Sequence, residues 1–232
     1  MKREFNPPIS HPAYFIKKYL YKHISELSTQ LKGRLLDFGC GEKPYEELFN
    51  VTEYIGLDYN GEGTTYAKEK VDVFYDGKII PFSNNYFDSI FSTEVFEHIF
   101  NAEEIIPELK RVLKPGGKML ITCPFAFPEH EIPVDFARYS SYGIRNLFEK
   151  HGFKTIVFLK TGNYVLARAQ MRSIYWNLFL LSKINNIPII RQIVRKTFFT
   201  VSHFIAILKS KILPESNIYY LSNVLLVEKV DS

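Results

Sequence analysis

The feature that most restricts the fold of this chain is the alternation of short apolar segments with amphipathic helical patterns. The apolar segments read as strands at 34–38, 53–57, 71–74, 87–92, 118–122, 154–159 and 219–228. Helical patterns precede or separate them at 13–31, 45–50, 102–113 and 140–151. Parallel strands need such crossover helices, and a sheet covered on both faces has strands that are apolar throughout. The order therefore predicts an α/β fold around a mainly parallel sheet.

The composition is that of an ordinary folded protein and narrows the setting of the chain. Of the 232 residues, 46% are hydrophobic and 23% are charged. Cys40 and Cys123 are the only cysteines, which excludes a disulfide framework. The opening residues lack the continuous apolar region of a secretory signal, and no apolar stretch reaches the ~18 residues of a membrane span. We therefore expect a cytoplasmic protein.

Positive charge is concentrated in one segment, residues 165–214. Eight of the 29 Lys and Arg residues lie there without any Asp or Glu, and the remaining 21 share the rest of the chain with all 25 acidic residues. The eight are Arg168, Arg172, Lys183, Arg191, Arg195, Lys196, Lys209 and Lys211. A basic segment on an otherwise acidic chain indicates an anionic partner for that segment.

Polar and flexible residues follow the first predicted strands, where an open parallel sheet collects its ligands. Gly39 and Gly41 stand between a strand and a helix, so backbone N–H groups there can approach an anionic or polar ligand group. A nicotinamide-dinucleotide fingerprint would need a third glycine where Pro44 stands, which weakens that alternative without excluding it. Asp58 can accept hydrogen bonds from ribose hydroxyls, and Asp76 from an adenine amino group.

Four segments in order, LLDFGCG, YIGLDY, DGKIIPFSNNYFDSIFSTEVFEHI and LKRVLKPGGKMLITCPF, resemble the class I S-adenosylmethionine-dependent methyltransferases. The resemblance covers residues 35 to about 158. It implies a Rossmann-like, seven-stranded, mainly parallel sheet with an antiparallel last strand, and S-adenosylmethionine as the methyl donor. The cofactor-binding residues that it implies are Asp37, Gly39, Cys40, Gly41, Asp58, Asp76 and Glu94. Lys43 and Pro44 depart from the family loop, and Lys43 is placed to meet the methionine carboxylate.

Two histidines are candidates for a general base that takes a proton from an acceptor hydroxyl, His98 and His130. The alternative for His98 is that it pins its own loop. Glu94, Glu97, His98 and His130 also match, in type and order, the metal site of the small-RNA 2′-O-methyltransferases. Because the first three recur in relatives for which we infer no metal, we assign no metal ligand from the sequence.

Residues after the fifth predicted strand are where this superfamily builds its acceptor site. The substrate-binding candidates there are Glu131, Asp135, Arg138 and Tyr139, a set that suits a polyhydroxylated acceptor such as a sugar. For Asp135 and Arg138 the alternative is that they pair with each other.

The sequence divides into residues 1–33 as an N-terminal helical lid, 34–160 with 216–232 as a methyltransferase core, and 161–215 as a basic, aromatic helical insertion. In the insertion, 173–182 and 197–208 are uncharged apolar runs that we expect to be helical. They either pack on the core or on a second copy, making a homodimer, or they lie peripherally on the anionic inner face of a membrane. The acidic main body argues against a nucleic-acid partner, a short RNA excepted.

The expected reaction is O-methylation of a small-molecule, glycan or lipid-linked acceptor. Three alternatives stay open from the sequence. They are a cofactor-binding module without turnover that acts at a partner or membrane surface, a metal-assisted RNA ribose methyltransferase, and a nicotinamide enzyme.

Overall fold

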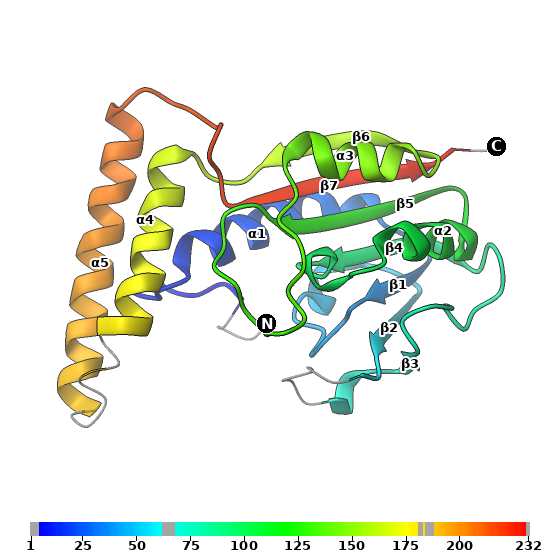
Figure 1. The fold of residues 1–232 in the computed structure, drawn as a ribbon, viewed down its shortest axis with the longest axis horizontal. Coiled ribbons are helices and arrows are strands. Elements are labelled where there is room, and N and C mark those ends of the chain that lie inside the picture. The colour runs from blue at the N-terminus through cyan, green and yellow to red at the C-terminus, as the bar shows by residue number, and fades with distance from the viewer. Residues whose placement is uncertain (1–4, 62–67, 181–182, 184–187, 231–232) are drawn as a thin grey trace.

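The computed structural model describes residues 5–61, 68–180, 183 and 188–230 (Figure 1). Its centre is a seven-stranded sheet with the strand order β3-β2-β1-β4-β5-β7-β6. The strands are β1 (Arg34–Phe38), β2 (Glu53–Tyr59), β3 (Val73–Tyr75), β4 (Phe87–Thr93), β5 (Leu113–Pro124), β6 (Phe153–Lys160) and β7 (Ser222–Lys229). Pairings among β1 to β5 are parallel, and β7 is antiparallel to both β5 and β6. The predicted fold class is confirmed.

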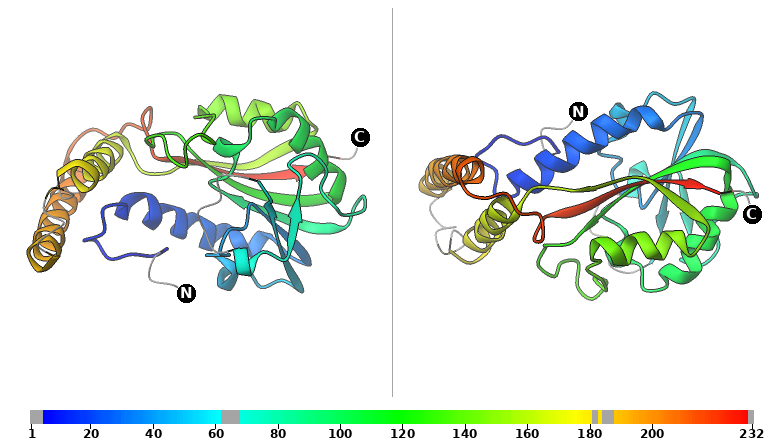
Figure 2. Two further views of the ribbon diagram at one scale, coloured as in Figure 1. Left: turned by 60° about the horizontal axis from the view of Figure 1, so that its bottom comes forward. Right: turned by 90° about the horizontal axis from the view of Figure 1, so that it is seen from above.

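Helices cover both faces of the sheet, which is why its central strands are apolar on both sides (Figure 2). One face carries α2 (Ala102–Val112) and α3 (Ser141–Glu149), whose inward residues join a core cluster with Phe38, Ile90 and Ile121. The other face carries α1 (Tyr14–Leu27), which packs on Leu35, Phe91 and other sheet residues, and α4 (Tyr164–Tyr175) joins the same cluster from beyond the end of the strands. Between α2 and α3 the chain returns through β5, so the sheet lies in the middle of a three-layer sandwich.

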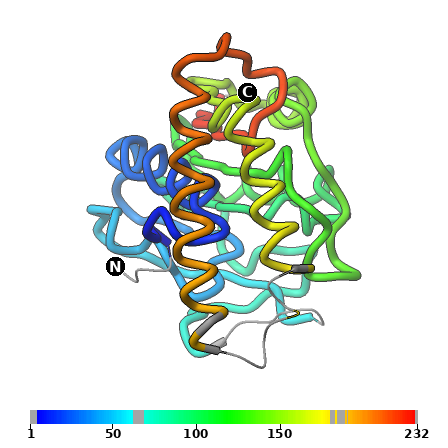
Figure 3. Tube along the Cα trace, turned by 90° about the vertical axis from the view of Figure 1, so that its left-hand side faces the viewer, coloured from blue at the N-terminus to red at the C-terminus, as the bar shows by residue number. Residues whose placement is uncertain are grey.

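The last helix, α5 (Pro188–Ile212), lies outside this sandwich beside α4 (Figure 3). A π-helical turn, η5 (Trp176–Leu180), continues α4 toward it. Among the helices that the structure describes, none has both the length and the apolar composition needed to cross a membrane.

The observed elements differ from the predicted ones at several boundaries. The helix predicted at 45–50 is only a 3₁₀ turn, η2 (Glu46–Leu48), and 3₁₀ turns also follow α1 (η1, Ser28–Gln30), precede β3 (η3, Lys68–Lys70) and follow β4 (η4, Phe96–His98). β5 begins at Leu113 because the Lys-Pro-Gly-Gly segment stays extended beside β4.

The helices of the insertion extend beyond the apolar runs at 173–182 and 197–208. Basic residues that flank these runs continue the helices, with Arg168 and Arg172 in α4 and Lys209 and Lys211 in α5. The side chain of Asn163 caps α4 by accepting the Leu166 N–H at 3.1 Å, so the helix starts at Tyr164. Residues 181 and 182 lie outside the described part of the chain. The division into lid, core and insertion stays a prediction.

Candidate functional site

The loop after β1 requires glycine for two different reasons. Gly39 has a φ of +73°, and a Cβ there would lie 2.4 Å from Cγ2 of Val95, so no side chain fits. Gly41 has a φ of +49°, and a Cβ there would meet no atom within 4 Å. The Val95 side chain thus fills the space beside Gly39, whereas Gly41 borders open space that a ligand can fill.

Asp58 connects this loop to the second strand. It lies within β2 rather than after it, because the strand extends to Tyr59. Its Oδ2 accepts the Gly41 N–H at 2.8 Å and its Oδ1 accepts the Tyr59 N–H at 2.7 Å. Each carboxylate oxygen has two acceptor positions, so Asp58 retains capacity for two ligand hydroxyls.

A cavity of about 570 Å³ lies beside Asp58 at the carboxyl ends of β1, β2 and β4. Gly39, Asp58, Asp76, Glu94, His98, His130 and Glu131 all line it, so these predicted residues lie around one space. Its aromatic walls were not predicted, and they include Phe38, Tyr59, Tyr75 and Phe136. Tyr59 and Tyr75 could have been suspected because they end two neighbouring strands.

Three other predicted cofactor residues lie outside the described lining of this cavity. The Cys40 side chain is buried against Gly56 of β2, so only its backbone faces the loop. Asp37 is buried at the end of β1, where the Tyr54 hydroxyl donates to its Oδ2 at 2.7 Å. Its Oδ1 has no hydrogen-bond partner among the described residues, and burial raises the pKa of Asp37 to about 7. Gly41 lies at the edge of the loop.

Two side chains at the loop and the cavity rim have local roles. Oδ1 of Asp76 accepts the N–H groups of Lys78 at 2.9 Å and Ile79 at 3.0 Å, and these bonds lower the pKa of Asp76. It therefore closes its own turn as well as lining the cavity. The Lys43 ammonium pairs with Asp72, and its contact with a methionine carboxylate stays a prediction.

At the other end of the cavity, Glu94 is held in place by two hydroxyls. The hydroxyls of Thr122 and Ser222 donate to its carboxylate at 2.9 and 3.3 Å, and burial raises the pKa of Glu94. Its backbone has a φ of +52°, a strained value for a non-glycine residue. Such strain at the end of a central strand is typical of a functional position.

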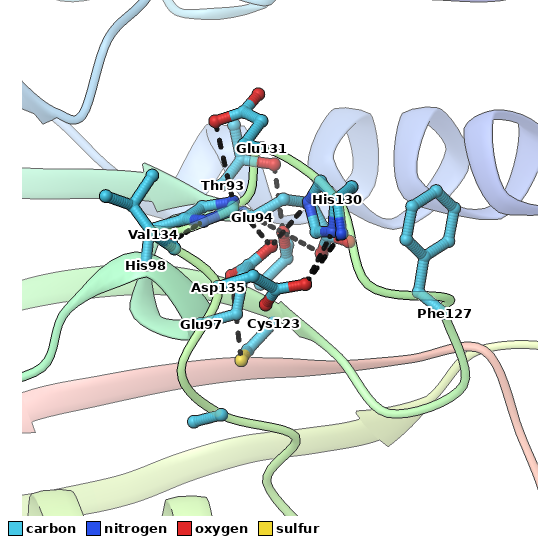
Figure 4. Close-up of polar contacts among 12 residues, drawn as sticks. Thr93, Glu94, Glu97, His98, Cys123, Phe127, His130, Glu131, Val134 and Asp135 are labelled. Carbon is cyan, nitrogen blue, oxygen red and sulfur yellow. Dashed lines mark hydrogen bonds and ion pairs between the residues drawn. The ribbon is translucent and has the colours of Figure 1, made fainter. Parts of the chain in front are cut away.

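The two imidazoles face each other across the acceptor end, with ring centroids 4.7 Å apart (Figure 4). Nδ1 of His98 lies 2.6 Å from the carbonyl oxygen of Val134. A carbonyl can only accept, so Nδ1 of His98 carries a proton, and in the neutral ring Nε2 is the acceptor atom. Nδ1 of His130 lies 3.1 Å from Oδ2 of Asp135, which accepts, and 3.4 Å from the Arg138 guanidinium, which only donates; the shorter contact, with Asp135, favours a proton on Nδ1. Burial, and then the neighbouring His98, lowers the pKa of His130.

Both Nε2 atoms point toward one buried carboxylate, Glu97 (Figure 4). Its Oε1 lies 3.7 Å from Nε2 of His98 and 3.9 Å from Nε2 of His130, and it has no hydrogen-bond partner among the described residues. Oε2 of Glu131 lies 3.9 Å from Nε2 of His98. Ligand atoms of Glu97, His98 and His130 all lie within 4.8 Å of one another, an arrangement that could hold a metal ion. Glu94 turns toward Thr122 instead.

Asp135 and Arg138 adopt the paired arrangement. Both carboxylate oxygens of Asp135 accept from the Arg138 guanidinium, at 2.5 and 2.6 Å. Burial alone would raise the pKa of Asp135, but the bonds from Arg138 and from the His130 N–H outweigh it and lower that pKa to about 2. Arg138 also donates to the carbonyl oxygens of Phe127 and Pro128, so the pair holds the loop that carries His130. The fourth predicted substrate residue, Tyr139, packs against the core.

Known methyltransferases are similar to this chain in sequence. A family model described as a methyltransferase domain matches residues 36–121. The fatty-acid O-methyltransferase of Mycolicibacterium smegmatis is 27% identical over 150 residues, which cover 56% of this chain and 53% of that protein. The chain spans about half the length of the curated relatives that it matches first.

Solved structures show the same fold. The YcgJ protein of Bacillus subtilis has a TM-score of 0.52 at 18% identity, covering 91% of this chain and 100% of that one. The phosphoethanolamine N-methyltransferase 2 of Haemonchus contortus, solved in complex with S-adenosylmethionine, has a TM-score of 0.50 at 17% identity, covering 98% and 60%.

The sheet order, the glycine loop and the matched domain define a class of protein. Residues 36–121 match a methyltransferase domain, the sheet has the class I S-adenosylmethionine-dependent methyltransferase fold, and S-adenosylmethionine is the cofactor of this domain. The residues present fit that molecule, since Asp58 has free acceptor capacity for ribose hydroxyls and open space borders Gly41.

Proposed function

We propose that this protein methylates an oxygen atom of a polyhydroxylated acceptor, either a free small molecule, a glycan or a lipid-linked sugar. One observation carries the proposal, namely that a single cavity joins the cofactor residues Gly39 and Asp58 to the inward-facing Nε2 atoms of His98 and His130. The bound cofactor supplies an activated methyl group together with its own leaving group. The protein therefore has to bind, orient and deprotonate the acceptor.

The two imidazoles provide the base. As the acceptor oxygen gains the methyl group, its proton passes to an unprotonated Nε2, at His98 or at His130. The lowered pKa of His130 keeps that ring neutral and ready to accept. A positioned base of this kind contributes about 10²–10⁴ to the rate. The carboxylates of Glu131, which is exposed at the cavity rim, and of Glu94 can accept hydrogen bonds from further hydroxyls of the substrate.

A second candidate mechanism is that Glu97, His98 and His130 hold a divalent cation that grips two acceptor hydroxyls, those of an RNA ribose included. The separations of 3.7 and 3.9 Å between Glu97 Oε1 and the two Nε2 atoms are too long for hydrogen bonds. They are close to what two ligands about 2.0–2.2 Å from one ion would show. Each imidazole has its other nitrogen anchored, as ligating histidines do.

The choice between base and metal is made with labelled cofactor. Purified protein is incubated with S-adenosyl[methyl-³H]methionine and panels of sugars, lipid-linked sugars, fatty acids and short RNAs. His98→Gln and His130→Gln should each lower turnover about 10²-fold or more, and His151→Gln, on the exposed face beside Glu103, should not. Loss of turnover in chelator with recovery in Mn²⁺ supports the metal, and indifference to chelator supports the base.

Other outcomes would reject the proposal. Methylation of nitrogen or carbon acceptors only would refute the assignment to oxygen. Tight cofactor binding without turnover on any panel, together with unaltered behaviour of the His98 and His130 variants, would favour a cofactor-binding module without catalysis.

A further inference from the structure

The outward face of α5 carries six exposed apolar residues. Successive helix residues are about 100° apart, so residues three, four or eight positions apart fall on the same side of the helix. We call these residues the α5 stripe: Ile189, Ile193, Val201, Phe204, Leu208 and Ile212. Phe204 is 56% exposed and Ile212 is 80% exposed. A helix on a soluble surface normally presents polar residues there, so the stripe indicates a binding face.

The opposite face of α5 is fixed, so the stripe cannot turn inward. Phe199 and His203 are fully buried there. Nε2 of His203 lies 2.8 Å from the Ser173 hydroxyl of α4, and its Nδ1 lies 2.6 Å from the carbonyl oxygen of Ile9. Gln170 of α4 adds contacts to the start of α1, accepting the Phe15 N–H at 3.0 Å. The helix pair is thus clamped to the N-terminal segment with its apolar stripe outward.

A groove of about 940 Å³ runs between α4 and α5 next to the stripe. Its lining is mostly apolar and includes Trp176, Phe198 and Ile205. Three cationic side chains, Arg168, Arg172 and Lys209, line it as well. Figure 3 shows the two helices side by side at the front of the molecule, with no other described element in front of them. The groove therefore offers apolar surface and positive charge together.

Charge decides which occupant this surface fits. Lys196, Lys209 and Lys211 are exposed around the stripe, and residues 165–214 contain no acidic residue. A two-fold dimer through the stripe would bring the same basic residues of both copies together, which like-charge repulsion opposes. Single-stranded nucleic acid is held by aromatic stacking, whereas the exposed stripe is mainly Ile, Val and Leu. An apolar stripe with basic flanks suits an anionic lipid surface.

We propose that α4 and α5 bind the protein to an anionic membrane surface, with the α5 stripe dipping among the lipid chains and the basic residues meeting the headgroups. The proposal stands apart from the proposed function, because it needs no assumption about the acceptor. The membrane-binding proposal and the proposed function are nevertheless connected by the position of the docking face. Since β7 is antiparallel to both β5 and β6, β6 runs in the same direction as β5. The carboxyl end of β6 leads into α4, so the docking face lies at the same end of the sheet as the cavity. A lipid-linked acceptor would reach that cavity from the membrane.

The test is co-sedimentation of the full chain with vesicles. Vesicles of phosphatidylglycerol and phosphatidylcholine should bind it at least about tenfold more tightly than phosphatidylcholine alone, and high salt should abolish the difference. Phe204→Asp with Ile193→Asp should lower binding about tenfold or more. Lys196→Ala and Lys209→Ala should each lower it about fivefold.

Matched controls lie on other exposed surfaces. Tyr142→Asp on α3 and Lys154→Ala on β6 carry the same kinds of change and should bind vesicles as the unaltered protein does. Retained binding of S-adenosylhomocysteine shows that each variant is folded. Three results would overturn the proposal. They are equal binding to both vesicle types, a concentration-dependent dimer that Phe204→Asp separates without any vesicle binding, and short-RNA binding lost in the same variants.

Discussion

Replacing Gly39 and Gly41 by alanine separates the structural from the ligand-binding use of the glycine loop. Both have positive φ, which costs a residue with a Cβ about 1–2 kcal/mol. At Gly39 the new Cβ would also lie 2.4 Å from Val95, an overlap that adds about 1–3 kcal/mol. We therefore expect Gly39→Ala to destabilise the protein by about 2–5 kcal/mol and Gly41→Ala by only about 1–2 kcal/mol.

The cofactor affinities should follow a different order from the stabilities. Gly41→Ala places a methyl group in the open space beside the loop, so it should weaken S-adenosylhomocysteine binding about tenfold or more while the fold survives. Urea denaturation measures the first quantity and titration calorimetry the second.

A third variant checks the cause of the Gly39 effect. Val95→Ala removes the two methyl groups that the new Cβ would meet, so Gly39→Ala in that background should lose about 1–3 kcal/mol less stability than in the natural sequence. Equal destabilisation at Gly39 and Gly41, with no coupling to Val95, would refute the reasoning.

Three further predictions concern residues around the site. Burial raises the pKa of Asp37 to about 7, so the free energy of unfolding should fall as pH rises from about 4 through 7. Urea denaturation at several pH values should show that Asp37→Asn flattens this decline. The same decline in the variant would contradict the prediction. Ser140→Ala removes the side chain that caps α3 by accepting the Gly143 N–H, so thermal unfolding should show a loss of about 1 kcal/mol in stability and calorimetry an unchanged cofactor affinity. A loss of cofactor affinity would contradict a purely capping role for Ser140. Arg138→Lys breaks the bidentate bond to Asp135, so it should lower turnover in steady-state assays by about tenfold more than it lowers cofactor affinity. Equal losses of turnover and cofactor affinity would contradict the role of Arg138 in holding the His130 loop.

Much of the sheet could be predicted because its strands are locally distinct. β1 was predicted at its observed bounds, since an apolar run is closed there by Gly33 and Gly39. Asp58 was expected after a strand but lies inside one, because β2 gains pairing from β3 up to Tyr59. This pairing partner lies in a separate segment of the chain, so the local sequence pattern around Asp58 does not reveal it.

The candidate site was predictable in its members but not in their partners. His98, His130 and Glu131 were found by type and position, yet only the folded chain brings their side chains around Glu97. Asp135 and Arg138 were undecided because an acid and a base three residues apart suit either role. The surrounding carbonyl oxygens of Phe127 and Pro128 decide for the pair.

The insertion was the least predictable part. Apolar residues occur on several sides of α5, so the sequence alone gives no reason for Phe199 to be buried and Phe204 to be exposed. That difference follows from where His203 is held by Ser173 and Ile9. Long-range polar contacts of this kind set the orientation of a helix after its local pattern has set its length.

The most direct test of the account is calorimetric titration of the purified protein with S-adenosylmethionine, S-adenosylhomocysteine and NAD, with Asp58→Ala as the comparison. We expect micromolar binding of the first two, no binding of NAD, and loss of both affinities in the variant. Absence of binding to the unaltered protein, or binding that Asp58→Ala leaves intact, would contradict the assignment of the cavity to the methyl donor.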